Sequence, residues 1–105
     1  MTGPVLGVLV AEGAAAFARA GIECAELEAR LLAQHVFGLN RAGLIVHERD
    51  TVGDGAAARF AALVSRRLSR EPLAYILGER EFWGLAHLVL REQSGIARYP
   101  IYRPQ

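Results

Sequence analysis

Apolar residues dominate the first twenty positions and predict a helix that is more apolar than an ordinary surface helix. Gly3-Pro4 is typical of a helix start, because a proline at the first helical position has no N–H to leave unbonded. Gly21 can supply a left-handed stop after about Arg19. Between these signals only Glu12 and Arg19 are charged. We expect such a helix to be buried in the core or covered by a partner.

Two later stretches repeat apolar residues at intervals of three to four and predict amphipathic helices. The first runs from Cys24 to Phe37 and is closed by Gly38. The second begins near Thr51 or Asp54, either of which can cap it through a side-chain oxygen. Its apolar stripe consists of Phe60, Leu63, Val64 and Leu68.

A shorter apolar run lies between these two helices, and the pattern leaves its conformation open. Asn40 can cap a short helix that extends through Ile45. The Leu-Ile-Val run at residues 44–46 is equally compatible with a brief strand. The charged residues 47–50 that follow are typical of a solvated turn.

Helix-breaking and β-prone residues alternate after the last long helix. Pro72 ends that helix, about one further turn is predicted, and Gly78 stops it. Phe82 and Trp83 favour a strand, and residues 81–90 can form a hairpin. The predicted fold class is therefore mainly α, a small bundle of four to five helices ending in a short β-hairpin.

Composition and length limit what this bundle can be. The chain has 105 residues, of which 52% are hydrophobic and 22% charged, as in a globular domain with a single core. That length is too small for a helical domain and a complete nucleotide-binding sheet. Residues 53–58 match the dinucleotide fingerprint G-x-G-x-x-A, but no predicted strand runs directly into its first glycine. A simple helix start explains these residues better.

The most distinctive order of residues runs from position 66 to position 85. It reads Arg-Arg, then Glu-Pro-Leu-Ala-Tyr-Ile, then Gly, then Glu-Phe-Trp-Gly-Leu. This order resembles the segment that closes the N-terminal domain of HemK-type (PrmC) release factor glutamine methyltransferases. Residues 27–32, after the Gly21-Ile22 turn, are similar to the second helix of that family. The resemblance covers roughly residues 5–89 and only the family's smaller, non-catalytic domain.

The resemblance implies two parts in this chain. Residues 1–90 would be a HemK-type N-terminal helical substrate-recognition domain with a terminal β-hairpin. Residues 91–105 depart from the family pattern, and we expect them to be an extended tail. Members bind S-adenosylmethionine in a separate Rossmann-like sheet and hold the target glutamine with an Asn-Pro-Pro-Tyr motif. Here Asn40 is followed by Arg and no Pro-Pro pair occurs, so we expect the catalytic domain to be absent and the chain alone to be inactive.

The implied function is binding of a class 1 peptide chain release factor for a protein-glutamine N-methyltransferase. The implied partners are that release factor and a catalytic methyltransferase domain, in cis or in trans. We expect no catalytic, cofactor-binding or metal-ligating residue in this chain; S-adenosylmethionine belongs to a full-length member. The residues expected to contact the partner are Arg66, Arg70, Arg80 and Trp83.

The same arginines have a structural explanation of equal weight. Arg66, Arg67 and Arg70 fall near a helix end, where positive charge complements the helix dipole. An alternative function is therefore a small helical protein- or RNA-binding module with no methyltransferase link. The net charge of only +1 disfavours nucleic acid as the partner.

The apolar start followed by Ala14-Ala15-Ala16 could be a secretory signal, but we expect neither export nor membrane insertion and a cytoplasmic protein. No positive charge precedes the first apolar run, and Glu12 interrupts it, unlike a secretory signal. The run is also shorter than the about 20 apolar residues of a membrane span. Cys24 is the single cysteine, so it has no disulfide partner within the chain, and we expect it to pack as a small apolar residue.

Overall fold

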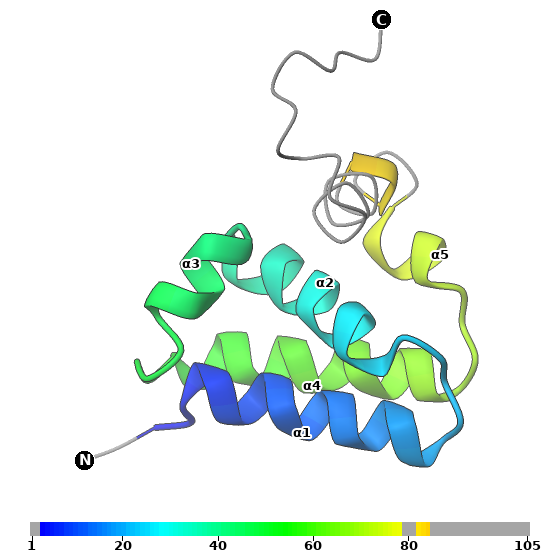
Figure 1. Cartoon of the computed structure of the whole chain (residues 1–105), viewed down its shortest axis with the longest axis horizontal. Coiled ribbons are helices and arrows are strands. Elements are labelled where there is room, and N and C mark those ends of the chain that lie inside the picture. The colour runs from blue at the N-terminus through cyan, green and yellow to red at the C-terminus, as the bar shows by residue number, and fades with distance from the viewer. Residues whose placement is uncertain (1–2, 79–81, 85–105) are drawn as a thin grey trace, which may run out of the picture.

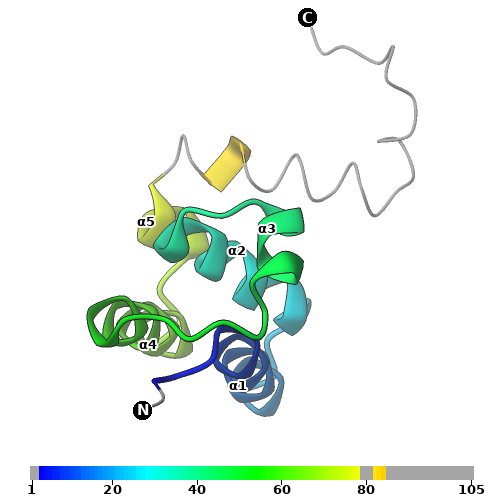
Figure 2. The same ribbon diagram turned by 90° about the vertical axis from the view of Figure 1, so that its left-hand side faces the viewer.

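Five helices account for most of the residues that the structure, a computed structural model, describes, namely residues 3–78 and 82–84. The helix α2 lies over α1 and α4, which run side by side, and α3 and α5 flank α2 (Figures 1 and 2). The mainly helical fold is thus as the sequence predicts. The bounds are α1 Leu6–Arg19, α2 Ala25–Phe37, α3 Arg41–Val46, α4 Asp54–Leu68 and α5 Leu73–Leu77.

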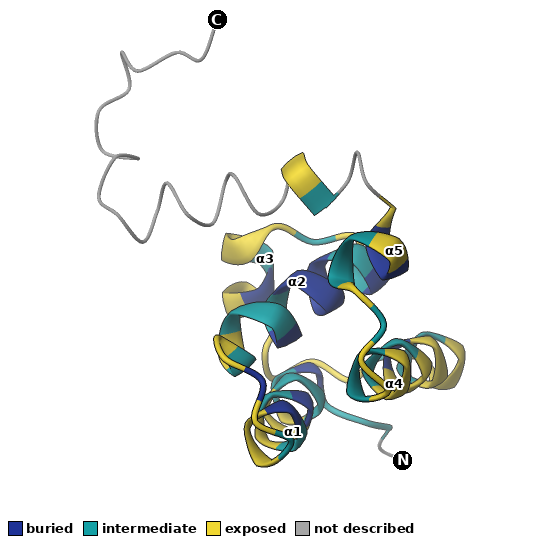
Figure 3. Cartoon of the chain, turned by 90° about the vertical axis from the view of Figure 1, so that its right-hand side faces the viewer, coloured by how far each residue is buried: buried dark blue, intermediate teal, exposed yellow. Residues whose placement is uncertain are grey.

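The central helix α2 supplies most of the core. Figure 3 shows it largely buried, whereas the outer face of α4 is exposed. Leu32 is fully buried in α2, and Phe17 of α1 and Phe60 of α4 are buried beside it in the same cluster. Burying one such side chain stabilises the fold by about 1.5–3 kcal/mol. The apolar periodicity of the sequence therefore identified the correct faces of α2 and α4.

The start of α1 is held by a loop and not by its proline. Val52 N–H donates to the carbonyl of Pro4 at 2.8 Å, Val5 is the extended N-cap residue, and the helix begins at Leu6 and not at Pro4. The N–H groups of Leu6 and Gly7 donate to the carbonyls of Asp50 and Glu48 at 2.9 and 2.8 Å. A Cβ at Gly7 would lie 2.9 Å from the Glu48 oxygen, so only glycine permits this close approach.

The glycine stops and the short third helix are confirmed. Gly21, Gly38 and Gly78 all have positive φ, at +83°, +67° and +88°. Asn40 caps α3, because its Oδ1 accepts a hydrogen bond from Gly43 N–H at 2.7 Å. The run at residues 44–46 is therefore helical and not a strand.

The predicted start of α4 needs a correction. Gly53 is the N-cap residue, and no side chain caps the helix. Thr51 instead pairs with Val5 in an isolated antiparallel bridge, and Asp54 is the first residue of the helix. Its carboxylate still lies at the positive end of the helix dipole, which is favourable. No strand runs into Gly53, which removes the structural basis of the dinucleotide fingerprint.

Two local expectations are wrong in the described residues. Residues 82–84 are helical where the sequence predicts a strand, and Phe82 N–H donates to the carbonyl of Gly78 at 2.8 Å. Strand propensity depends on a pairing partner, and the local helical bond prevails here. Cys24 is exposed at the start of α2, not packed. The rest of the predicted hairpin and the tail 91–105 lie outside the described residues.

Among the described residues, none of the helices combines the length and the apolar character that a membrane crossing requires.

Candidate protein-binding surfaces

Arg66 and Arg70, two of the predicted contact residues, lie with Arg67 at one end of the bundle, where α4 ends beside the end of α1 and the start of α2. Arg67 donates from Nε to the Glu28 carboxylate at 2.7 Å, and both side chains are largely buried. Arg70 donates from Nη2 to the Ala20 carbonyl at 2.6 Å. We call these two interactions the arginine clasp, because they tie α4 to α2 and α1.

Arg70 follows α4 in a left-handed conformation, with φ +76°, where glycine is the usual residue. Its backbone turn directs the chain toward Pro72, while its guanidinium satisfies a carbonyl at the end of α1. A side chain that is already bonded in this way has less to offer a partner. The structural explanation of Arg70 is the one that the contacts support.

Arg66 forms a local ion pair with Glu71 across the end of α4. Its Nε donates to Glu71 Oε1 at 2.9 Å, and its Nη2 donates to Oε2. The hydrogen bond from Arg66 lowers the pKa of the Glu71 carboxyl, and the same bond raises the pKa of the Arg66 guanidinium. About half of the Arg66 side chain stays exposed, so a partner can still reach it.

The remaining predicted contacts are placed only in part. Trp83 is 63% exposed and packs edge-on against Phe82, with ring centroids 5.2 Å apart. It makes no hydrogen bond with Arg66 or Arg70 in the described structure. Arg80 lies outside the described residues.

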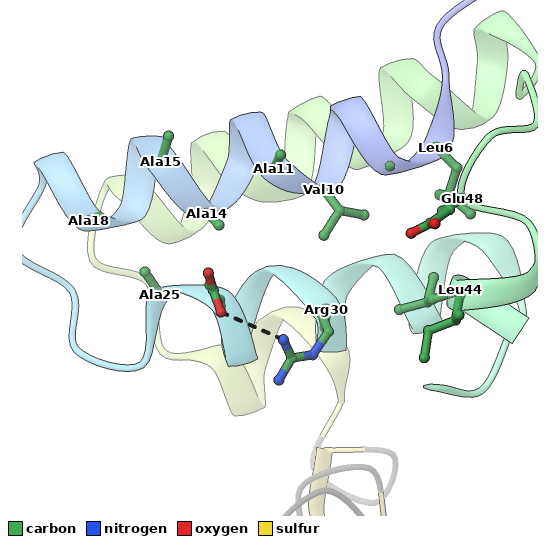
Figure 4. A pocket seen from close by; sticks show the side chains of 13 residues that line it. Leu6, Val10, Ala11, Ala14, Ala15, Ala18, Ala25, Arg30, Leu44 and Glu48 are labelled. Carbon is green, nitrogen blue, oxygen red and sulfur yellow. Dashed lines mark ion pairs between the residues drawn. The ribbon is translucent and has the colours of Figure 1, made fainter. Parts of the chain in front are cut away.

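A second surface, which the sequence did not reveal, is a groove formed by α1, α2 and α3. The hollow measures about 520 Å³ (Figure 4). Its α1 wall is made of small and aliphatic side chains, and Leu44 and Ile45 close it on the side of α3. We call it the α1–α3 groove. The α1 residues along it are Leu6, Gly7, Val10, Ala11, Ala14, Ala15 and Ala18.

Three charged residues stand around this groove, and they are poorly paired. Arg30 Nη1 lies 3.9 Å from Glu26 Oε1, at the limit of an ion pair. Arg30 Nε is buried and has no hydrogen-bond acceptor within residues 3–78 and 82–84. Glu48 is exposed and has no ion-pair partner among the same residues. The groove therefore combines apolar walls with charged side chains that make few polar contacts within the described part of the domain.

Metal chemistry finds no support in the described part of the chain, where no group of three or more His, Cys, Asp or Glu side chains could hold an ion. His47 pairs with Asp50 at 2.7 Å on the exposed turn. That turn is solvated, as its sequence indicates.

Comparison with known families decides what kind of domain this is. The family described as PrmC N-terminal domain matches residues 9–78, which contain nearly all of α1 to α5. The chain belongs to this family. The resemblance read from residues 66–85 and 27–32 is thereby confirmed.

Curated relatives of this PrmC N-terminal domain carry the name release factor glutamine methyltransferase. The protein from Bordetella pertussis is 52% identical over 58 residues, which are 55% of this chain and 22% of that protein. The protein from Deinococcus radiodurans is 38% identical over 77 residues, or 73% of this chain and 28% of its own length. The protein from Cereibacter sphaeroides is 41% identical over 75 residues, or 71% and 27%.

The chain thus spans about a quarter of the length of the relatives it matches. No solved structure matches it.

Proposed function

We propose that this PrmC N-terminal domain is a substrate-recognition domain that binds a class 1 peptide chain release factor. The observation that carries the proposal is the match over residues 9–78 to a family whose curated relatives are named release factor glutamine methyltransferase. A helical bundle with exposed polar and apolar surfaces is suited to holding a protein.

We propose that the methyl transfer itself takes place in a separate domain. A methyltransferase domain, in cis or in trans, binds S-adenosylmethionine and modifies the release factor glutamine, while this domain of residues 1–90 keeps the substrate in place. The proposed site of action is the cytoplasm. Of the contact residues proposed from the sequence, Arg66, Arg70 and Trp83 are exposed, although Arg70 already donates to the Ala20 carbonyl, and Arg80 remains a proposal.

The proposal is tested by titrating the 105-residue chain into a fluorescently labelled bacterial class 1 release factor. We expect saturable binding, and tighter binding when a catalytic domain from a relative is supplied separately. The variant Arg59→Ala changes an exposed position of α4 and should bind like the wild type. Absence of binding, with and without the catalytic domain, would contradict the proposal.

A further inference from the structure

The α1–α3 groove has the dimensions of a helix-binding site. Its α1 wall runs from Leu6 to Ala18, twelve steps along the helix, or about 18 Å at 1.5 Å per residue. That length corresponds to about three helical turns of a partner. The groove also continues onto exposed apolar surface, since Ile45 at its edge is 61% exposed.

Small side chains along α1 would let a second helix approach closely. Ala11, Ala14, Ala15 and Ala18 recur at intervals of three and four, so they line one side of α1. Alanine leaves room for the larger apolar side chains of an incoming helix, as in ridge-and-groove packing. The same spacing explains why α1 is more apolar than its position at the surface requires.

The charged residues around the groove indicate which charged side chains the incoming helix should carry. Glu26 and Arg30 come from α2, and Glu48 lies beyond α3 at the opposite end, beside Leu6 and Leu44 (Figure 4). Basic side chains on the partner would complement the two glutamates. A carboxylate on the partner would pair with the guanidinium of Arg30, whose side chain is 27% exposed and whose Nη1 lies 3.9 Å from Glu26.

We propose that the α1–α3 groove binds an amphipathic helix of the release factor, apolar toward α1, with basic residues facing Glu26 and Glu48 and an acidic residue facing Arg30. The inference rests on the proposed function and adds the surface and the chemistry of the contact. It makes the groove the principal docking surface, and the exposed Arg66 and Trp83 secondary contacts.

Two other occupants fit the groove less well. A second copy of the chain, related by two-fold symmetry, would place one hollow against another and leave the grooves unfilled. RNA would bring phosphates against apolar walls and two carboxylates. A helix from a different protein satisfies both the apolar wall and the charges.

The test compares groove variants with matched controls in the release factor titration. Ala15→Trp fills the groove, and Ala62→Trp places the same bulk on the exposed face of α4. Glu48→Arg reverses a groove charge, and Glu12→Arg makes the same change on α1 outside the groove. We expect Ala15→Trp to raise the Kd by about tenfold or more. Glu48→Arg should raise it several-fold, and both controls should stay within about twofold of the wild type.

Each outcome of this test is informative. If the wild type binds and the groove variants bind like their controls, the groove proposal is wrong while the proposed function stands. If the wild type does not bind at all, both fail. A third outcome is that the chain dimerises in solution and that Ala15→Trp abolishes the dimer but leaves release factor binding unchanged. In that case the groove binds a second copy of the chain and the groove proposal is wrong. Circular dichroism checks folding, and Glu48→Arg decides the matter if Ala15→Trp unfolds.

Discussion

The arginine clasp and the α1–α3 groove both include residues of α2, but they differ in whether their charged side chains have partners within the domain. At the clasp, Arg67 and Arg70 bond to acceptors within the domain at 2.7 and 2.6 Å. At the groove, Arg30 lacks an acceptor for its buried Nε, and Glu48 lacks an ion pair within the described part of the chain. The clasp is therefore a structural device, and the groove is the surface with unsatisfied binding capacity.

Charge density alone is therefore a poor guide to a binding surface. A cluster of arginines at a helix end suggests a binding surface in the sequence, yet acceptors within the domain can bind the same guanidinium groups. An unpaired buried polar atom beside an apolar hollow, such as Arg30 Nε, is a better sign, because a desolvated polar group without a partner is costly. Variants that separate stability from binding can test this contrast.

The largest effect should come from the helix that both regions share. Leu31 in α2 is 2% exposed, and Leu31→Ala would leave a cavity that costs about 2–5 kcal/mol of unfolding free energy. Urea denaturation followed by circular dichroism measures the loss. Arg59→Ala, on the exposed face of α4, should stay within about 0.5 kcal/mol of the wild type. An unchanged urea midpoint for Leu31→Ala would show that Leu31 is not part of the core that supports the two regions.

The next largest effect should come from opening the arginine clasp. Arg67→Ala leaves the partly buried Glu28 carboxylate without its partner and should cost about 1–3 kcal/mol. A double-mutant cycle with Glu28→Ala isolates the interaction between the two side chains. If the two single changes simply add, the clasp is not the structural device described here.

Groove variants should show the reverse pattern. Ala15→Trp and Glu48→Arg alter exposed positions, so their unfolding free energies should stay within about 0.5 kcal/mol of the wild type while release factor binding weakens. Arg67→Ala, where it remains folded, should bind normally despite its lower stability. Denaturation and binding curves measured in parallel check both statements. A clasp variant that lost release factor binding while keeping its stability would show that the clasp is also part of the binding surface.

The smallest effect should be a pH-dependent one at Arg66 and Glu71. Because the pKa of Glu71 is lowered in the folded state, the pair stabilises the protein above the unfolded-state pKa of a glutamate. That stabilisation is lost as the pH falls through the folded-state pKa. The stability difference between wild type and Glu71→Gln should therefore be small at neutral pH and vanish in acid, as urea titrations at several pH values would show. A difference independent of pH would exclude the ionised pair as its cause.

Periodicity and breakers predicted most of the fold because those signals are local. Leu31 and Phe60 lie on the buried faces that their spacing indicates, and Gly21, Gly38 and Gly78 stop their helices as their freedom at positive φ allows. Where the sequence misplaced the start of α1, the deciding partner was distant. The start of α1 is fixed by carbonyls from residues 48–50, which no local pattern could reveal.

The candidate site was less predictable for the same reason. Arg70 looks free in the sequence, and only the fold brings Ala20 against it, fifty residues earlier. The groove depends on three helices meeting, so no single motif encodes it. The one signal that could have found it was the excess apolar character of residues 5–19, which indicated a helix buried or covered by a partner.

The most direct test of the account is the chemical-shift map of the isotope-labelled chain when unlabelled release factor is added. We predict that the largest backbone shifts fall along α1 from Gly7 to Ala18 and on Ile45 and Glu48, with little change at Arg67. Shifts concentrated at the arginine clasp, or no shifts at all, would contradict the account.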